Sequence, residues 1–285
     1  MATVLIPIPR RDFDPTEVAV SWSVLERLGH RVVFATPDGR PGACDELMIS
    51  GRGLDPWSPL PVLGHLRLIG LALRADANGR DAYARMSQAP AFQAPLRWDE
   101  IDLATVDGLL LGGGHRARGM REFIESPRLQ SVVVDAFARE MPVAAICHGV
   151  LLLARSRRAD GRSVLHGRRT TSLTWKQERL ASALAHVVRF WDRHYYRTYV
   201  EQPGEPAGFM SVEQEVTRAL ARPSDYVDVP PDSLHRLRQT GGLWRDTFDD
   251  ERPAFVVQDG RYVSARWPGD THTFARRFAA LLPAA

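Results

Sequence analysis

The chain is poor in cysteine and lysine, and it has no long uninterrupted run of apolar residues. Its 285 residues include two cysteines, Cys44 and Cys147, so we predict no disulfide framework and favour a reducing compartment. The most apolar stretches, such as HLRLIGLALRA at 65–75, are short and contain arginine, which argues against a membrane span. MATVLIPIP at 1–9 has no basic leader, which indicates a first strand and no secretory signal. We therefore expect a cytoplasmic protein.

The charge balance does not indicate a charged macromolecular partner. Lys176 is the only lysine, and 37 basic residues stand against 34 acidic ones, for a net charge of +3. The basic residues are spread along the chain, so we predict neither nucleic-acid binding nor membrane binding. The densest basic and aromatic segment, HVVRFWDRHYYRTYV at 186–200, has helical spacing of its apolar residues. We interpret this segment as a packed helix or a dimer contact.

Apolar strand patterns alternate with helical patterns along much of the chain. This alternation predicts an α/β fold with a parallel sheet and helices on both faces. The strands are predicted at TVLIPI, RVVFAT, DGLLLG and PVAAIC, and the helices at 15–28 and through VVVDAFARE. Ligands bind such sheets at the carboxyl ends of the strands, where Cys147, the glycines after Leu111 and the loop after Ile8 emerge.

The C-terminal part adds a strand pair and a closing helix. AFVVQDG and RYVSARW are predicted to form a hairpin around an Asp259-Gly260 turn, followed by a helix at 271–282. We expect one domain, 1–285, with two segments outside the alternation. Residues 40–100 are predicted to form a lid over the crevice, and the insertion 182–250 to shape either the pocket mouth or an oligomer interface.

Cys147 lies in PVAAICHGVLLLARS, between a short apolar strand and an apolar helix. A thiol at such a strand-to-helix elbow stands clear of the sheet, and the helix N-terminus favours the thiolate. An isolated cysteine in an apolar stretch is usually a small buried hydrophobic residue. His148 and Gly149 change that interpretation, because they bring a titratable ring and a close backbone approach. We therefore predict a reactive cysteine.

Several motifs resemble the DJ-1/PfpI superfamily, and most closely its Hsp31-like branch. The resemblance implies a flavodoxin-like parallel sheet sandwiched by helices, with a cap, a cysteine nucleophile, no cofactor and a small-molecule substrate. Homodimers are frequent among similar proteins, so we also expect a homodimer. The resemblance covers most of the chain except residues 182–250, and it rests on DGLLLGGGH at 107–115, AAICHG at 144–149, DFDPTEVAVSWSVLERLGHRVVFATPDG at 12–39, DPWSP at 55–59 and TSLTWKQERLA at 171–181.

The resemblance and the residue types together suggest a catalytic set. Glu17 corresponds to a carboxylate that reaches the thiol in the family, where it could donate to a thiolate or accept the thiol proton. Gly113 and Gly114 could present backbone N–H groups as an oxyanion hole with the N–H of His148. A glycine triplet fits a tight turn equally well. The family pattern often has a further glycine after the histidine, whereas this chain has Arg116.

His148 is the expected general acid or base beside the thiol, and it requires an acidic partner. Glu178 matches the region where some Hsp31-like relatives carry that acid, with Asp160 and Asp270 as weaker candidates. His115 is predicted to contact the substrate. The remaining histidines have no metal-site spacing, so we predict no metal.

The leading functional hypothesis is thiol attack on a small reactive carbonyl, as the Hsp31-like resemblance implies. The reaction would be a glyoxalase III-like, glutathione-independent conversion of methylglyoxal to lactate. The alternatives are a hydratase or hydrolase of the isonitrile hydratase or PfpI type, and a non-enzymatic chaperone or redox sensor with an oxidisable Cys147.

Overall fold

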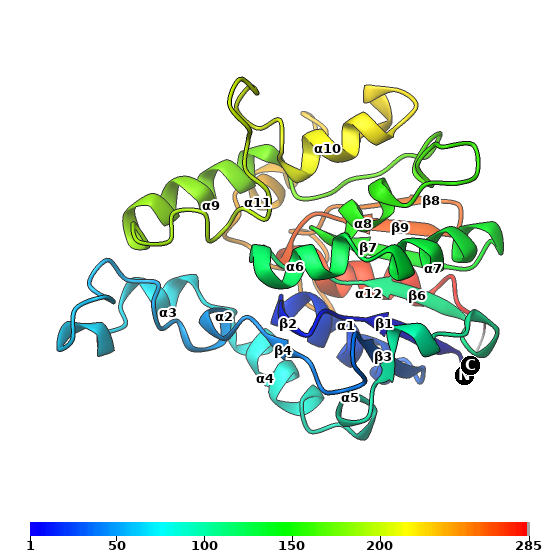
Figure 1. Ribbon diagram of the computed structural model, residues 1–285, viewed down its shortest axis with the longest axis horizontal. Helices are drawn as coiled ribbons and strands as arrows, with labels where there is room; N and C mark the ends of the chain where they lie inside the picture. The colour runs from blue at the N-terminus through cyan, green and yellow to red at the C-terminus, as the bar shows by residue number, and fades with distance from the viewer. Residues whose placement is uncertain (284–285) are drawn as a thin grey trace.

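The computed structural model describes residues 1–283, which form an α/β fold around a seven-stranded sheet (Figure 1). The strand order is β5-β3-β1-β6-β7-β9-β8, and every neighbouring pair is parallel except β8 with β9. The predicted flavodoxin-like class is therefore confirmed. The strands are β1 (Thr3–Pro7), β3 (Arg31–Thr36), β5 (Leu96–Arg97), β6 (Gly108–Leu111), β7 (Val143–Ile146), β8 (Val256–Asp259) and β9 (Tyr262–Ala265), with a separate pair, β2 (Arg11–Phe13) and β4 (Ala43–Cys44).

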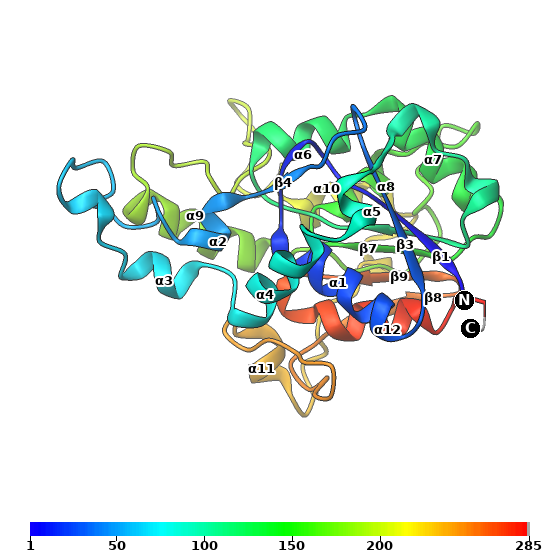
Figure 2. The ribbon, with the colours of Figure 1, turned by 90° about the horizontal axis from the view of Figure 1, so that it is seen from below.

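Helices cover both faces of the sheet, as Figures 1 and 2 show. The strand β6 illustrates why, because Leu109 and Leu111 pack into one core cluster and Leu110 packs into the other. A strand buried on both faces is typical of a parallel sheet. The first cluster is covered by α6 (Ala117–Ile124), α7 (Pro127–Ala138) and α8 (Gly149–Arg155), and the second by α1 (Pro15–Arg27), α4 (Ala77–Met86) and α12 (Thr271–Ala279).

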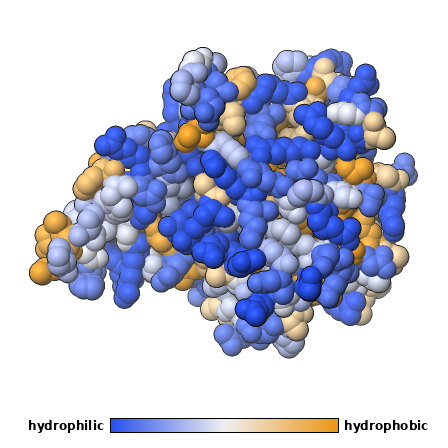
Figure 3. All heavy atoms as spheres, viewed as in Figure 1, coloured by the Kyte–Doolittle hydropathy of each residue, from blue (hydrophilic) through white to orange (hydrophobic). Residues whose placement is uncertain are grey.

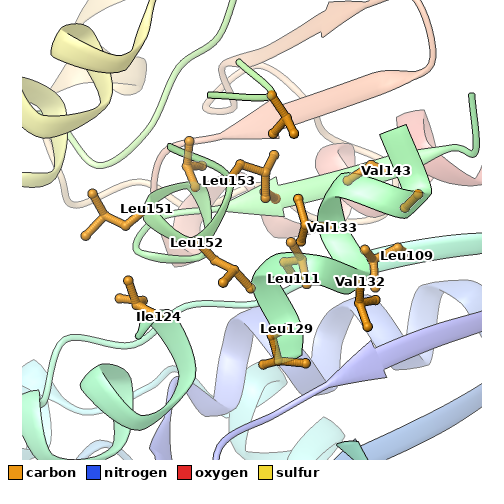
Figure 4. Close-up of a cluster of buried hydrophobic side chains, with 14 of the residues drawn as sticks. Leu109, Leu111, Ile124, Leu129, Val132, Val133, Val143, Leu151, Leu152 and Leu153 are labelled. Atoms are coloured by element: carbon orange, nitrogen blue, oxygen red, sulfur yellow. The ribbon is translucent and has the colours of Figure 1, made fainter. Parts of the chain in front are cut away.

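The first core cluster is a dense aliphatic layer (Figure 4). Leu111 of β6, Val133 of α7 and Leu152 of α8 are buried in it almost completely. Each fully buried side chain of this kind contributes roughly 1.5–3 kcal/mol of transfer free energy. The layer anchors α8, and with it the position of the residues that precede α8.

The helices and loops at the left of Figure 1 belong to the connection 40–100 and to the helix that leads into the insertion 182–250. The connection 40–100 carries exposed apolar side chains, including Val62 and Leu68. Hydrophobic residues gather at the left end of the surface in Figure 3. The remaining helices are α2 (Glu46–Ser50), α3 (Ile69–Leu73), α5 (Pro90–Gln93), α9 (Trp175–Val188), α10 (Val212–Ala219) and α11 (Arg236–Thr240), and short 3-10 turns lie at Leu63–His65, Trp98–Glu100, Leu103–Thr105, Pro223–Asp225 and Pro268–Asp270.

The expected helix over 186–200 is wrong beyond its first residues. Helix α9 ends at Val188, and the following residues form turns. Phe190 and Trp191 are exposed, whereas Tyr195 and Tyr199 are buried. The aromatic residues therefore do not share one helical face, because hydrogen-bonded turns at 189–195 replace the helix.

The C-terminal hairpin is confirmed, since β8 and β9 pair antiparallel and Gly260 has a left-handed φ of 60° at the turn. Helix α12 begins at the predicted Thr271 and ends at Ala279, before the predicted end. Within residues 1–283, no helix combines the length and the apolar character that crossing a membrane requires.

Candidate active site

Cys147 occupies the predicted elbow, directly between β7 and α8. Its φ of 55° is in the left-handed region, which is unfavourable for a residue with a Cβ atom. Such strain costs about 1–3 kcal/mol and persists only where the surrounding structure enforces it. Here the Cys147 N–H donates to the Ala265 carbonyl at 3.1 Å, which ties the elbow to β9.

Gly149 explains how α8 can start so close to the sheet. A Cβ atom at this position would lie 2.5 Å from the Leu111 carbonyl oxygen and 2.8 Å from that of Gly112. Backbone atoms cannot yield to such an overlap, so the close approach requires glycine. The glycine after Cys-His is therefore part of the elbow.

Glu17 is brought to the thiol by the N-terminus of α1. Asp14 caps this helix, because its Oδ1 accepts hydrogen bonds from the N–H groups of Thr16 (2.8 Å) and Glu17 (3.0 Å). Glu17 is completely buried, and its Oε2 accepts the Gly113 N–H at 2.8 Å. Its Oε1 has no hydrogen bond of good geometry, and the Cys147 thiol is the side-chain group that interacts with this carboxyl.

Burial raises the pKa of Glu17 well above its usual value, and the neighbouring Asp14 carboxyl adds to the increase. Burial also raises the pKa of the Cys147 thiol, as do the Glu17 and Asp14 carboxyls. These effects favour the protonated thiol and oppose the helix N-terminus, which was expected to favour the thiolate. The short helix α8 does not compensate for the loss of water and for two adjacent acidic groups. The thiol remains protonated until a proton acceptor removes its hydrogen.

His148 lies beside the thiol, with its Nδ1 at 3.4 Å from Sγ. The ring is fully buried, and burial lowers the pKa of His148 to about 3, so the imidazole is neutral. Its Nε2 is buried without a hydrogen-bond partner. A neutral ring with such a low pKa is a weak base, so the prediction of His148 as general base is not favoured by this environment.

The nomination of Glu178 as the acidic partner of His148 is not supported. Its Oε1 forms an ion pair with Arg197 Nε at 2.8 Å, and its Oε2 accepts the Val212 N–H at 3.0 Å. No hydrogen bond in the described chain joins this carboxyl to His148. Glu178 instead connects α9 to two parts of the insertion, Arg197 and the start of α10. The sequence around Glu178 does not predict these contacts.

The two weaker acidic candidates are also engaged elsewhere. Asp160 is exposed and accepts the Arg162 N–H at 3.0 Å in a turn. Asp270 is buried and forms a bidentate ion pair with Arg266, with contacts of 2.8 and 3.0 Å.

Gly113 and Gly114 have different roles in the structure, which the glycine triplet in the sequence does not indicate. The Gly113 N–H is taken by Glu17, so Gly113 positions the carboxyl and is not an oxyanion donor in this structure. The Gly114 N–H has no acceptor among the hydrogen bonds of residues 1–283, and Gly114 lines the cavity. The His148 N–H points to the Cys147 sulfur and lowers its pKa slightly. Gly114 is thus the free backbone donor of the predicted pair.

Arg116, which replaces the expected glycine, fits its position without strain. Its φ of −77° is accessible to any residue, and it precedes the first residue of α6. Its guanidinium lies 3.6 Å from the buried Asp12 carboxylate. The loop therefore keeps its form through ion pairing.

A cavity of about 320 Å³ opens over the thiol. The elbow supplies Cys147, helix α1 supplies Glu17, and the loop after β6 supplies Gly114. The connection 40–100 supplies Met48 and Leu73, and the rest of the lining is mostly apolar. This combination of an apolar wall and few polar groups is typical of small-molecule sites. The later chain also contributes Leu173, Gln177, Glu178, Leu180, Ala181, Leu184, Tyr196, Gly241, Gly242, Leu243, Arg245, Trp267 and Pro268.

His115 lies on the cavity wall, where substrate contact was predicted. Its ring packs against those of Tyr195 and Tyr196, each with a centroid distance of 4.7 Å. Its Nε2 is 3.5 Å from the Asp45 carboxylate, which also accepts the Tyr195 hydroxyl at 2.7 Å. The insertion and the connection 40–100 thus jointly orient His115.

The sequence analysis missed Asp14, Asp45 and Arg245. The Asp14-Pro15 pair is a recognisable helix start, so Asp14 could have been identified as a capping residue. Asp45 and Arg245 carry no local signal, because only the folded chain brings Asp45 to His115 and Arg245 to the cavity. Among residues 1–283, no group of three or more His, Cys, Asp or Glu side chains is arranged to hold a metal ion.

Comparisons with known proteins agree with this architecture. Over 88 residues, or 30% of this chain, the sequence is 33% identical to protein DJ-1 homolog D of Arabidopsis thaliana, and the match spans 21% of that protein's length. Glyoxalase III of Candida albicans has a similar structure, with a TM-score of 0.57 at 15% identity, covering 100% of this chain and 98% of that one.

Two further solved structures share the fold at similarly low identity. They are the Rapid Encystment Protein of Francisella tularensis (TM-score 0.61, 16% identity, 99% and 100% coverage) and DJ-1beta of Drosophila melanogaster (TM-score 0.54, 15% identity, 100% and 91% coverage). The model of the "ThiJ/PfpI family-like" group matches residues 8–227, which is more than half of the chain. The protein with this buried elbow cysteine therefore belongs to the ThiJ/PfpI family.

Proposed function

We propose that this protein is a cysteine-dependent enzyme that converts small 2-oxoaldehydes to 2-hydroxy acids without glutathione, as a glyoxalase III does. The observation that carries the proposal is the convergence of a strained thiol, a buried carboxyl and a free backbone donor on one cavity, at Cys147, Glu17 and Gly114. The fold shared with the Candida albicans glyoxalase III supports it, at 15% identity.

In the first step, Sγ of Cys147 bonds to the aldehyde carbon of methylglyoxal. The thiol proton passes through the Glu17 carboxyl to the carbonyl oxygen, giving a hemithioacetal. Gly114 N–H donates to the developing oxyanion, which is most valuable in a cavity with little water. His148 Nδ1, at 3.4 Å from the sulfur, orients the thiol.

In the second step, ionised Glu17 removes the proton from the former aldehyde carbon and forms an enediolate, with the negative charge on the second oxygen. The hydroxyl proton of the first carbon moves to that second oxygen, and the protonated carboxyl gives its proton to the second carbon. These transfers leave a lactoyl thioester on Cys147 and an ionised Glu17. A carboxyl with a raised pKa suits both transfers, because its ionised form is a stronger base than an ordinary carboxylate. Water hydrolyses the thioester to lactate and restores the thiol.

The redox-sensor alternative is less consistent with the site. Oxidation by peroxide proceeds through the thiolate, and both burial and the neighbouring carboxyls raise the pKa of Cys147. A hydratase or hydrolase would use the same thiol. Parallel assays with an isonitrile and an amide therefore distinguish that alternative from carbonyl isomerisation.

The test is lactate formation from methylglyoxal by the purified protein without glutathione. We expect Cys147→Ala to abolish turnover, whereas Cys44→Ala, a matched change of a buried thiol that does not line the cavity, retains it. Equal turnover by wild type and Cys147→Ala, or none by wild type, would refute the proposal.

Three other expectations stay predictions. These are the Hsp31-like branch, a cytoplasmic location and a homodimer. Light scattering of the purified protein measures the oligomeric state directly.

A further inference from the structure

Arg245 places a positive charge on the wall of the cavity that contains Cys147. It follows α11 in the insertion, in the segment 241–245 that lines the cavity mouth. No role for this residue follows from the carbonyl chemistry described above. Its charge opposes the effect of burial on the pKa of Asp14, but its nearest ion-pair contact is as long as 4.0 Å.

The Arg245 guanidinium makes no hydrogen bond with the rest of the described chain, and its Nη1 is buried without a partner. The nearest carboxylate is that of Asp76, at 4.0 Å from Nε, and Asp76 already accepts the Gly79 N–H at 2.8 Å. The buried Arg266 differs, since it forms a bidentate ion pair with Asp270 that includes a contact of 2.8 Å. An unpaired buried donor is costly, so its retention on a cavity wall suggests a ligand.

Trp267 adds a second donor at the same wall. The Arg245 guanidinium lies 5.2 Å from the centre of the Trp267 ring, and both residues line the cavity. The indole Nε1–H of Trp267 is also buried without an acceptor. Arginine and tryptophan side chains only donate, so they favour a ligand group rich in acceptors.

The backbone beside Arg245 is held firmly. The Asp246 N–H donates to the Gly269 carbonyl at 2.8 Å, and the Asp246 carboxylate accepts the N–H groups of His272 (3.2 Å) and Thr273 (2.6 Å). These bonds attach the segment to the start of α12, where Gly269 follows closely after Trp267 in the chain. Arg245 is thus positioned before any ligand binds, which lowers the entropy cost of binding.

We propose that Arg245, with Trp267, binds a carboxylate at the far end of the substrate while the carbonyl end reaches Cys147. This inference rests on the proposed function for the carbonyl end and adds the substrate class, a 2-oxoaldehyde that carries a carboxylate. A guanidinium matches a carboxylate with two parallel hydrogen bonds. The 320 Å³ cavity falls in the range of small-molecule sites, and it exceeds what methylglyoxal requires.

A carboxylate fits the charges of the cavity better than a phosphate. Asp14, Glu17 and Glu178 line the same cavity as Arg245, whose positive charge is opposite in sign to that of an ionised carboxylate. Burial raises the pKa of Glu178 to about 7 and that of Glu17 well above its usual value, which reduces the competing negative charge. One guanidinium balances one added negative charge, whereas a phosphate dianion would leave an excess in a poorly hydrated site.

The first test measures binding without turnover. In the Cys147→Ala background, calorimetry compares 4-oxopentanoate with its uncharged methyl ester. We expect the acid to bind more tightly than the ester, and Arg245→Gln to raise the Kd of the acid about 10- to 100-fold while leaving that of the ester unchanged. Arg245→Lys should be intermediate, because lysine keeps the charge and loses the bidentate geometry.

Arg85→Gln is the matched control, since Arg85 is exposed on α4 outside this cavity and donates to Ser23 Oγ at 3.0 Å. It should leave both Kd values unchanged. Equal binding of acid and ester, or an unchanged Kd in Arg245→Gln, would overturn the carboxylate site. Tighter binding of dihydroxyacetone phosphate than of 4-oxopentanoate would also overturn it, in favour of a phosphate.

The second test separates this inference from the proposed function. Wild type is assayed with 4,5-dioxopentanoate and with uncharged 2-oxopentanal, each converted with one water to a 2-hydroxy acid. We expect a lower KM for the charged substrate, and a rise in that KM alone in Arg245→Gln. If the acid binds through Arg245 but neither aldehyde is converted, the enzyme proposal fails and the carboxylate site stands. If both aldehydes are converted with equal KM, the carboxylate site fails and the enzyme proposal stands.

Discussion

The two cysteines of this chain lie in regions with similar burial and different chemistry. Cys147 is 6% exposed and Cys44 is 7% exposed, and burial raises the pKa of both thiols, that of Cys44 to about 12. Cys44 ends the short strand β4 among apolar side chains, with Tyr83 as its polar neighbour. Cys147 has a left-handed φ and faces a cavity with Glu17.

The comparison shows that the thiol pKa does not identify the reactive cysteine here. Both sulfur atoms are held protonated by the loss of water. The difference lies in what can reach each sulfur and what can take its proton. At Cys147 a carboxyl with a raised pKa and a free Gly114 N–H share the cavity, and Cys44 has neither. Reactivity in this protein is therefore a property of the elbow and its neighbours.

The largest effect is expected from replacing Glu17, the proposed proton-transfer group beside Cys147. We expect Glu17→Gln to lower kcat for methylglyoxal about 10²- to 10⁴-fold, because the amide cannot carry the proton between the two substrate carbons. Glu26→Gln, an exposed change on the same helix, is the control and should leave kcat unchanged. A kcat of Glu17→Gln within a few-fold of wild type would assign the proton transfer to another group.

Alkylation compares the two thiols directly. We expect iodoacetamide to modify Cys147 at least about 10-fold faster than Cys44, because only Cys147 lines a cavity. The rate at Cys147 should rise with pH through a midpoint above the ordinary thiol value of about 8.5.

Glu17→Gln should lower that midpoint, since it removes a carboxylate that disfavours the thiolate. Peptide mass spectrometry after timed quenching gives both rates. Faster labelling of Cys44 would contradict the assignment of the accessible thiol.

A smaller effect is expected in the pH dependence of the free energy of unfolding, where the cavity residue Glu178 can be compared with Cys44. The pKa of Glu178 is about 7 in the folded protein and near 4.5 when unfolded, so the folded state binds more protons between these values. Its contribution to stability is complete below pH 4.5 and is lost as pH rises through 7. Urea unfolding from pH 5 to 8 should show a falling free energy of unfolding in wild type.

Glu178→Gln should flatten this slope, whereas Cys44→Ser should leave it unchanged, because the Cys44 thiol does not titrate in that range. An identical slope in wild type and Glu178→Gln would show that the carboxyl stays ionised through its ion pair with Arg197.

The insertion shows where sequence patterns lose their predictive value. The spacing of aromatic residues over 186–200 predicts a helix, but Arg189 ends it by binding back to the connection 40–100 through the Gly53 carbonyl and to Asp192. Glu178 has the position of a catalytic acid in the resemblance, but Arg197 takes its carboxylate. In both cases a contact between separate parts of the chain decides the outcome, and a local pattern contains no information about such a contact.

The sequence by itself determined the parallel sheet, the C-terminal hairpin and the elbow around Cys147, because apolar periodicity, turn residues and glycine spacing act over a few neighbouring residues. Only the tertiary structure decided that the thiol is protonated, that Gly113 serves Glu17 while Gly114 remains free, and that Arg245 shares the cavity. These properties depend on burial and on contacts between distant segments, and neither exists before the chain has folded.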